Sequence, residues 1–290
     1  MTIRQRVPRS WVPAIRETMV RTGRATSRWR MDPSFIVIGG QRCGTTSLFK
    51  ALEQHPQAVR PPVDKGTDYY TLHYDQGREW YRSRFPLGVT SRRRAARVGA
   101  PRAFEACTYY MFHPFAIERL ARDFPDIKLV VMLRDPVERA YSAFKHELAR
   151  RFESEHDFMR ALELEDSRLE GQVDRMRENV AYESLSHRHH AYRRRGQFAE
   201  QLDRVYTHFA REQVHVLDSE AFFAEPQREY HHLVTFLSLA EWQPAAFEVH
   251  NARPSSSMPD DARSYLREHF KVHDERLADL LGRRPSWAQL

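Results

Sequence analysis

Cysteine is scarce in this chain, with Cys43 and Cys107 as the two cysteines among 290 residues. Two cysteines cannot build a disulfide framework, and their positions show no spacing typical of a structural zinc site. Long apolar runs are lacking too, because no stretch approaches the roughly 20 residues that a membrane-spanning helix needs. The first residues also lack the apolar core of a secretory signal. We therefore expect free cysteines and a cytoplasmic location.

Positive charge is concentrated near the beginning of the chain rather than spread along it. Residues 1–30 hold eight arginines and one acid, Glu17, which accounts for the whole net charge of +7. The balanced remainder argues against a nucleic-acid-binding surface. We interpret residues 1–32 as a basic, flexible arm, more often a solvated extension than a contact with an anionic membrane surface. Residues 33–290 are expected to form a single domain.

The most informative motif spans residues 35–48. Four apolar residues at 35–38 suit a buried strand, glycines interrupt it, and helical spacing of apolar residues begins after Gly44. A strand, a glycine loop and a helix N-terminus together cradle phosphate groups. The spacing from Gly39 to Gly44 is that of a triphosphate-binding loop, but Thr45 stands where that loop needs lysine, and the cation is Arg42. Alone, this pattern does not separate an anion site from a tight structural turn.

A second motif follows the apolar run at 127–133. This run predicts a strand that ends in Arg134, with Asp135 as the cap and Pro136 as the first residue of a helix. A nucleotide triphosphatase would carry a magnesium-binding aspartate at the strand end, whereas a guanidinium there invites an anion. Ser142 lies two helical turns further on. The alternative is an ion pair of Arg134 with Asp135 or Glu138.

Strands and helices alternate along the chain. Apolar runs at 35–38, 103–105, 127–133 and 214–217 predict strands, and helical spacing marks 45–52, 77–85, 136–148, 225–239 and 261–282. Residues 155–211 read as mostly helical, and the basic stretch 88–102 reads as an exposed loop. This order predicts an α/β fold in three layers, with a central parallel sheet and a P-loop-like phosphate site.

The paired motifs resemble the sulfotransferase family that uses 3′-phosphoadenosine 5′-phosphosulfate. The two matching segments are Gly40-Gln41-Arg42-Cys43-Gly44-Thr45-Thr46-Ser47-Leu48 and Leu133-Arg134-Asp135-Pro136-Val137-Glu138-Arg139-Ala140-Tyr141-Ser142. More of the chain, over about 33–287, looks like the branch of heparan sulfate N- and 3-O-sulfotransferases and their bacterial relatives, including the segment Phe104-Glu105-Ala106-Cys107-Thr108-Tyr109-Tyr110.

The resemblance implies the donor, its binding residues and no metal. The first loop would hold the 5′-phosphosulfate and the second motif the 3′-phosphate, with the polar loop at 250–259 closing over that end. The donor-binding residues would be Gln41, Arg42, Cys43, Gly44, Thr45, Thr46, Ser47, Arg134, Ser142 and Arg253. For Cys43, a small residue filling a tight loop is favoured over a catalytic thiol whose pKa the helix end lowers.

The resemblance also implies catalytic roles. Arg42 would stabilise the leaving phosphate as a fixed charge, because a guanidinium keeps its proton. Members of this branch often carry a catalytic glutamate directly after a lysine in one segment. The matching segment here is Lys65-Gly66-Thr67-Asp68-Tyr69-Tyr70, in which Gly66 replaces that glutamate. Asp68 is the first candidate to replace it, with a turn cap as the alternative role, and Glu105 and His73 come second. The branch often has a lysine at the position of Ala106, and Lys65 could supply that positive charge instead.

The expected reaction is therefore sulfuryl transfer to a hydroxyl or amine of a sugar, other glycan or small-molecule metabolite. A small-molecule kinase and a catalytically inactive nucleotide-binding protein are the alternatives. The basic run at 192–195 could meet an acidic acceptor but is more often a solvated helix face. The histidines His187, His189 and His190 are interpreted as surface residues, and the sequence predicts neither the acceptor nor the oligomeric state.

Overall fold

Parallel strands form the centre of the fold. The computed structural model describes residues 22–248 and 257–289. Within these ranges, five strands pair in parallel in the order β2-β3-β1-β4-β5. Their bounds are Pro33–Gly39 for β1, Ala58–Val59 for β2, Arg102–Ala106 for β3, Lys128–Leu133 for β4 and Val214–Asp218 for β5. The predicted α/β fold with a parallel sheet is confirmed.

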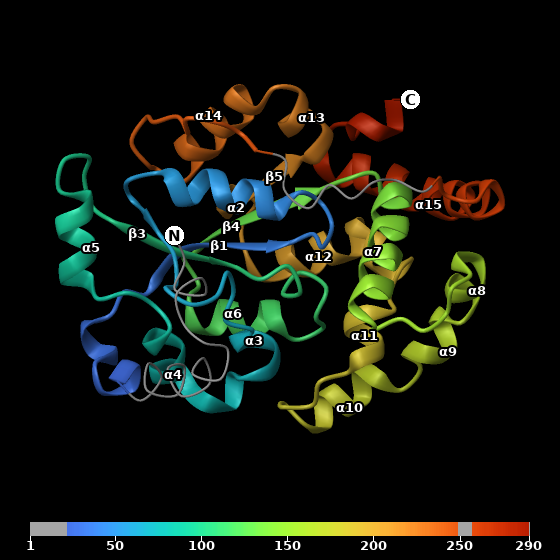
Figure 1. The fold of residues 1–290 in the computed structure, drawn as a ribbon, viewed down its shortest axis with the longest axis horizontal. Coiled ribbons are helices and arrows are strands. Elements are labelled where there is room, and N and C mark those ends of the chain that lie inside the picture. Colours follow the sequence, from blue (N-terminus) through green and yellow to red (C-terminus); the bar gives the residue numbers. More distant parts are fainter. Residues whose placement is uncertain (1–21, 249–256, 290) are drawn as a thin grey trace.

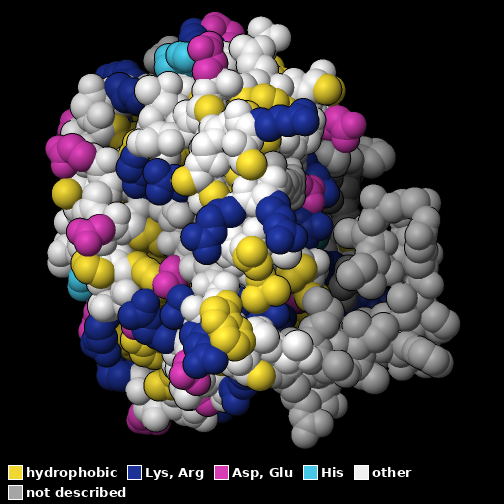
Figure 2. All heavy atoms as spheres, turned by 90° about the vertical axis from the view of Figure 1, so that its left-hand side faces the viewer, with side chains coloured by type: hydrophobic (Ala, Val, Ile, Leu, Met, Phe, Trp, Pro, Cys, Tyr) yellow, Lys and Arg dark blue, Asp and Glu magenta, His cyan; other side chains and the backbone are white. Residues whose placement is uncertain are grey.

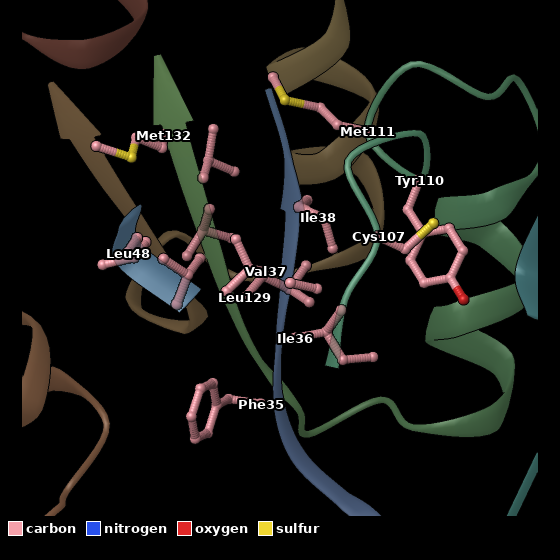
Figure 3. Packing of buried hydrophobic residues seen from close by; sticks show 14 of the residues in the cluster. Phe35, Ile36, Val37, Ile38, Leu48, Cys107, Tyr110, Met111, Leu129 and Met132 are labelled. Atoms are coloured by element: carbon pink, nitrogen blue, oxygen red, sulfur yellow. The ribbon is translucent and has the colours of Figure 1, made fainter. Parts of the chain in front are cut away.

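The central strands are apolar because both faces of the sheet are covered. Phe35, Ile36, Val37 and Ile38 are at most 1% exposed. Successive side chains of β1 alternate between the two sides, so that Phe35 points toward the side of Leu48 and Ile36 toward the side of Tyr110 (Figure 3). The core therefore lies directly beneath the loop that follows β1.

Helices cover the sheet on both sides, which gives the predicted three layers (Figure 1). On one side lie α2 (Thr45–Gln54) and α14 (Pro226–Phe236), joined where the Tyr230 hydroxyl donates to the carbonyl of Ala51. On the other side lie α6 (Ala116–Asp123) and α12 (Phe198–His208). The long α7 (Pro136–Arg150) follows β4, and α15 (Asp260–Leu281) packs against α7 and α12.

Shorter elements complete the chain and confirm the mostly helical character of residues 155–211. That stretch holds α8 (Phe158–Glu163), α9 (Glu165–Leu169), α10 (Gln172–Glu178), α11 (Leu185–His189) and η5 (Arg194–Gly196). The remaining elements are η3 (Ser27–Trp29), α3 (Tyr69–Leu72), η4 (Tyr74–Gln76), α4 (Gly77–Ser83), α5 (Gly88–Ala95), η6 (Arg211–Gln213), α13 (Ser219–Ala224) and η7 (Ser286–Gln289). No helix in the described ranges is both long and apolar enough to cross a membrane.

Two expectations need correction at the face that carries α4 and α5, where basic and apolar side chains alternate (Figure 2). The stretch 88–102 is not all loop, because α5 forms there with Ser91 and Ala95 buried beneath its exposed arginines. Residues 22–32 are packed rather than part of a free arm, since Arg30 pairs with Leu87 in a β-bridge and Asp32 binds Arg82. Residues 1–21 lie outside the described part of the chain.

Candidate functional site

A cleft of about 830 Å³ opens at the carboxyl ends of β1 and β4, where α/β folds usually bind ligands. Its lining comes from the loop after β1, the beginning of α2, the segment at 65–68, the segment after β3, one face of α7, the end of α11, η5 and α13. The two sequence motifs, almost 100 residues apart, therefore meet in one cavity.

The first wall is the glycine loop. Gly44 takes φ +86° as the residue before α2, in the left-handed region that suits glycine. A Cβ on Gly44 would lie 2.9 Å from the Phe223 ring, so a larger residue would also displace that ring. No side chain caps α2, and Thr45 and Thr46 of its first turn line the cleft. The open helix N-terminus thus faces the cavity, as a phosphate site requires.

The second wall begins at Arg134. Asp135 caps α7 as predicted, because its carboxylate accepts from the amides of Val137 at 2.8 Å and Glu138 at 3.4 Å. Arg134 does not form the ion pair with Asp135 or Glu138 that was the alternative. Its Nε lies 3.8 Å from Glu220 Oε1, while its Nη1 donates to the carbonyl of Arg42 at 3.4 Å. The guanidinium therefore joins the two motifs.

A second contact ties the motifs together, since Arg42 Nε donates to Ser142 Oγ at 3.0 Å. The cleft brings together seven of the residues predicted to bind the donor, namely Gln41, Arg42, Gly44, Thr45, Thr46, Arg134 and Ser142. Cys43 and Ser47 are buried beneath the loop instead. Arg253 falls outside the described residues.

Cys43 has a structural role in the loop. Its side chain is fully buried, and burial raises the pKa of the Cys43 thiol to about 12 despite nearby arginines. The thiol therefore stays protonated at neutral pH, which removes the catalytic-thiol alternative and its expected lowering of the pKa. A small residue filling a tight loop was the favoured prediction for this position.

Positive charge dominates the cleft. Its basic residues are Arg42, Lys65, Arg134, Lys145, Arg150, Arg188 and Arg195, and its acids are Asp68, Glu138 and Glu220. Lys65 lies at the loop itself, where its Nζ donates to the Thr45 carbonyl at 3.0 Å. Burial lowers the pKa of Lys65 to about 8. An open helix end, a glycine cradle and an excess of cations fit a ligand that carries separated phosphate groups.

Asp68 reaches the cleft from the segment after Gly66. Its carboxylate pairs with Arg188 at 2.9 Å and accepts from the Cys107 thiol at 3.2 Å. Asp68 precedes α3, but its side chain makes no capping hydrogen bond, so a turn cap does not explain this carboxylate. Gly66 packs closely, since a Cβ there would lie 2.7 Å from the Ala106 carbonyl oxygen.

The second-choice bases lie away from the cleft. Glu105 is fully buried and is not among the residues that line the cavity. Its carboxylate accepts from Tyr81 at 2.7 Å, from Tyr110 at 3.1 Å and from the Thr67 amide at 2.6 Å. Burial raises the pKa of Glu105 in spite of these bonds. The contacts give Glu105 a structural role, and His73 packs against Trp80 with ring centroids 4.7 Å apart.

The structure adds site residues that the sequence analysis missed or placed on the surface. His187, His189 and Arg195 are each less than 8% exposed, which corrects the expectation of surface histidines and a wholly solvated basic run. His189 and Arg195 line the cleft, and Glu147 lies fully buried behind them. One signal was available for Glu147, because it falls three, four and seven residues after buried positions of α7.

A parallel sheet with a phosphate-cradling loop and a second arginine motif defines an α/β protein that binds a nucleotide-like ligand with two phosphate ends. Residues 32–259 match the family described as "Sulfotransferase domain". The chain belongs to this family of enzymes, for which 3′-phosphoadenosine 5′-phosphosulfate is the implied donor.

Curated relatives support the same family. The chain is 24% identical, over 88% of its length, to "Membrane-associated sulfotransferase kil1" of Dictyostelium discoideum, and it covers 66% of that protein. It is 28% identical, over 75% of its length, to "Bifunctional heparan sulfate N-deacetylase/N-sulfotransferase 1" of Caenorhabditis briggsae, of which it covers 24%. The chain thus spans just under two thirds of the first relative and about a quarter of the second.

Among solved structures, a sulfotransferase from Alicyclobacillus acidocaldarius is similar, with a TM-score of 0.66 and 28% identity. The match covers 90% of this chain and the whole of the other. The predicted fold and family are both confirmed by these comparisons.

Proposed function

We propose that the protein transfers a sulfuryl group from 3′-phosphoadenosine 5′-phosphosulfate to a hydroxyl or amine of a sugar or small metabolite. The observation that carries this proposal is the meeting of the two anion motifs, with Arg42 Nε 3.0 Å from Ser142 Oγ and Arg134 bonded to the loop. When bound, the donor supplies a sulfuryl group whose S–O bond to the 5′-phosphate breaks as the acceptor bonds to sulfur.

The residues of the cleft would stabilise charge and hold the acceptor. Arg42 is a fixed cation for the negative charge that builds on the leaving phosphate. Lys65, bonded to the first residue of α2, would add a second cation at the same end. Arg134 and Ser142 would bind the 3′-phosphate, as the family resemblance implies. The reaction needs no metal on this proposal, because Arg134 follows β4 at the position where a triphosphatase has its magnesium-binding aspartate.

The excess of basic residues in the cleft as a whole favours an acidic acceptor. Seven basic residues line the cavity against three acids, although Arg188 pairs with both Asp68 and Glu183 and Arg150 lies 3.9 Å from Glu147. A carboxylate, phosphate or sulfate on the acceptor would complement this charge. Asp68 stays the sequence-based prediction for the proton acceptor, although Arg188 and Cys107 each occupy one of its oxygens.

Thermal unfolding with two ligands tests the proposal. We expect 3′,5′-bisphosphoadenosine to raise the melting temperature strongly, and ATP with magnesium to raise it weakly or not at all. Labelled sulfate from the donor should then appear on an acidic sugar or small-molecule acceptor, in the presence of a metal chelator. A shift with ATP and magnesium alone would support a kinase, and binding of the bisphosphate without transfer to any acceptor would support an inactive nucleotide-binding protein.

A further inference from the structure

A buried carboxylate holds a histidine at the wall of the same cleft. His189 is the last residue of α11, lines the cavity and is 7% exposed. Its Nδ1 lies 2.9 Å from Oε2 of Glu147, a fully buried residue of α7. A carboxylate behind an imidazole is an arrangement that orients a histidine for proton transfer.

The protonation states follow from the surroundings of Glu147. Burial acts to raise the pKa of Glu147, but the hydrogen bond from His189 and positive groups including His146 and Arg150 lower it overall. The carboxylate is therefore ionised and can only accept, so Nδ1 of His189 carries the proton. In the neutral imidazole, Nε2 then keeps its lone pair.

Packing fixes the plane of the ring. Phe152 stacks on His189 with ring centroids 4.0 Å apart and an angle of 5° between the planes. His190 Nε2 in turn lies 2.8 Å from the carbonyl oxygen of Phe152, which holds the backbone of that residue next to α11. Within the described residues, the contacts of His189 involve Nδ1 and the ring face, which leaves Nε2 for the cleft.

The same carboxylate also reaches the phosphate loop. Gln41 Nε2 donates to Glu147 Oε1 at 3.1 Å, and the Arg195 guanidinium donates to Gln41 Oε1. Gln41 belongs to the loop that cradles the donor. One buried group thus places the imidazole and the loop relative to each other.

We propose that His189 is the general base of the transfer and that Glu147 is its positioning residue, an inference that rests on the proposed function. The acceptor O–H or N–H proton passes to Nε2 as the acceptor bonds to sulfur, and the imidazolium later releases it to solvent. Asp68 is the weaker candidate, because one oxygen binds Arg188 and the other accepts from Cys107. Asp68 would instead hold Arg188 in place for the acceptor.

A pH–rate profile separates these roles. Besides Glu147, the charged and titratable groups around His189 are His146 and Arg150 on α7, Arg188 and His190 beside it, and Arg195 on η5. The arginines stay charged throughout, so an acid limb between about pH 5 and 8 would report a histidine. His189→Gln should lower kcat by roughly 100- to 10,000-fold and abolish that limb, with bisphosphate binding retained.

Further variants keep the test decisive. Glu147→Gln should lower kcat less than His189→Gln and raise the donor KM through Gln41. His187→Gln, which removes a buried histidine of the same helix that bonds Tyr109, should keep the acid limb. His189→Ala should regain activity with added imidazole, which a purely structural role would not allow.

The outcomes distinguish the inference from the proposed function. If the wild-type protein transfers no sulfuryl group, the proposed function fails. If it does transfer, and His189→Gln binds the bisphosphate and keeps the wild-type profile, the assignment of His189 is wrong. Loss of the acid limb in Asp68→Asn alone would return the role of base to Asp68.

Discussion

Lys65 gives the donor site a pH dependence that can be measured. Its partly buried ammonium group lies beside the first turn of α2, and burial lowers the pKa of Lys65 to about 8. A phosphate bound at the helix end would stabilise the charged form, so the pKa of Lys65 must be higher with ligand than without. Affinity is then constant below pH 8 and falls as the pH rises from the free pKa toward the bound one.

The size of the effect follows from Coulomb's law. A unit charge about 4 Å from a phosphate oxygen contributes about 4 kcal/mol at an effective dielectric constant near 20. Water reaches the open cleft and the side chain retains some motion, so we expect about 1.5–3 kcal/mol between the charged and neutral forms. Such a difference corresponds to a roughly 10- to 150-fold rise in Kd for 3′,5′-bisphosphoadenosine.

Calorimetric titration from pH 8 to 10 provides the measurement, because a phosphate with a second pKa near 6 is about fully ionised from pH 8 upward and adds almost no slope of its own. Lys65→Arg should keep tight binding across this range, since a guanidinium does not titrate there. Lys65→Met should bind weakly at pH 8 and show no slope. If Kd rises with pH by the same slope in the wild type, Lys65→Arg and Lys65→Met, the assignment of the pH dependence to Lys65 is refuted.

Three further predictions concern other parts of the site. Arg42→Ala should reduce transfer at least 100- to 1000-fold in a labelled-sulfate assay, since the leaving phosphate loses its fixed cation. Lys50→Ala, on the exposed side of α2, is the control and should retain activity. An active Arg42→Ala protein would overturn the mechanism. Gly66→Ala should lower the melting temperature through a cost of about 1–3 kcal/mol, because its Cβ would meet the Ala106 carbonyl, whereas Gly88→Ala, with ordinary contact distances, should not. Glu105→Ala should lower the free energy of unfolding by roughly 3–5 kcal/mol in urea titrations, since three buried donors lose their acceptor. Burial raises the pKa of Glu105, so its contribution is complete in acid and is lost as the pH rises through the folded pKa; the same pH slope in the variant would contradict this.

The parts of the site that could be predicted from sequence are those encoded within short segments. Strand β1, its glycine loop and α2 follow from an apolar run, two breaking glycines and helical spacing, all within residues 35–52. The cap at Asp135 and the first-turn Pro136 are equally local signals, and the structure reproduces both. Because the carboxyl ends of neighbouring parallel strands lie at one edge of a sheet, even the meeting of Arg42 and Arg134 could be inferred.

The rest of the site depends on contacts between distant segments. Arg195 donates to Gln41, 154 residues away, and no local pattern around the basic run indicates that its guanidinium is buried. The helix α11 has five residues, too few for a periodic pattern to separate its two buried histidines from its exposed residues. The sequence pattern therefore favoured a solvated surface where the fold forms a wall of the cleft.

The glycine at residue 66, where the family branch often has a glutamate, links the local sequence signals to the contacts between distant segments. A side chain there would place its Cβ 2.7 Å from the carbonyl oxygen of Ala106. The backbone of Ala106 is held close by, because its amide donates to the carbonyl of Lys65 at 2.9 Å. A base at this position would therefore require the backbone of residue 66 or of Ala106 to shift. A transferase with this segment must take its proton acceptor from another element, and α11 presents the one imidazole in the described cleft that a buried carboxylate orients. Gly66 and the His189–Glu147 pair are, on this reasoning, two consequences of moving the base from one wall of the cleft to the other.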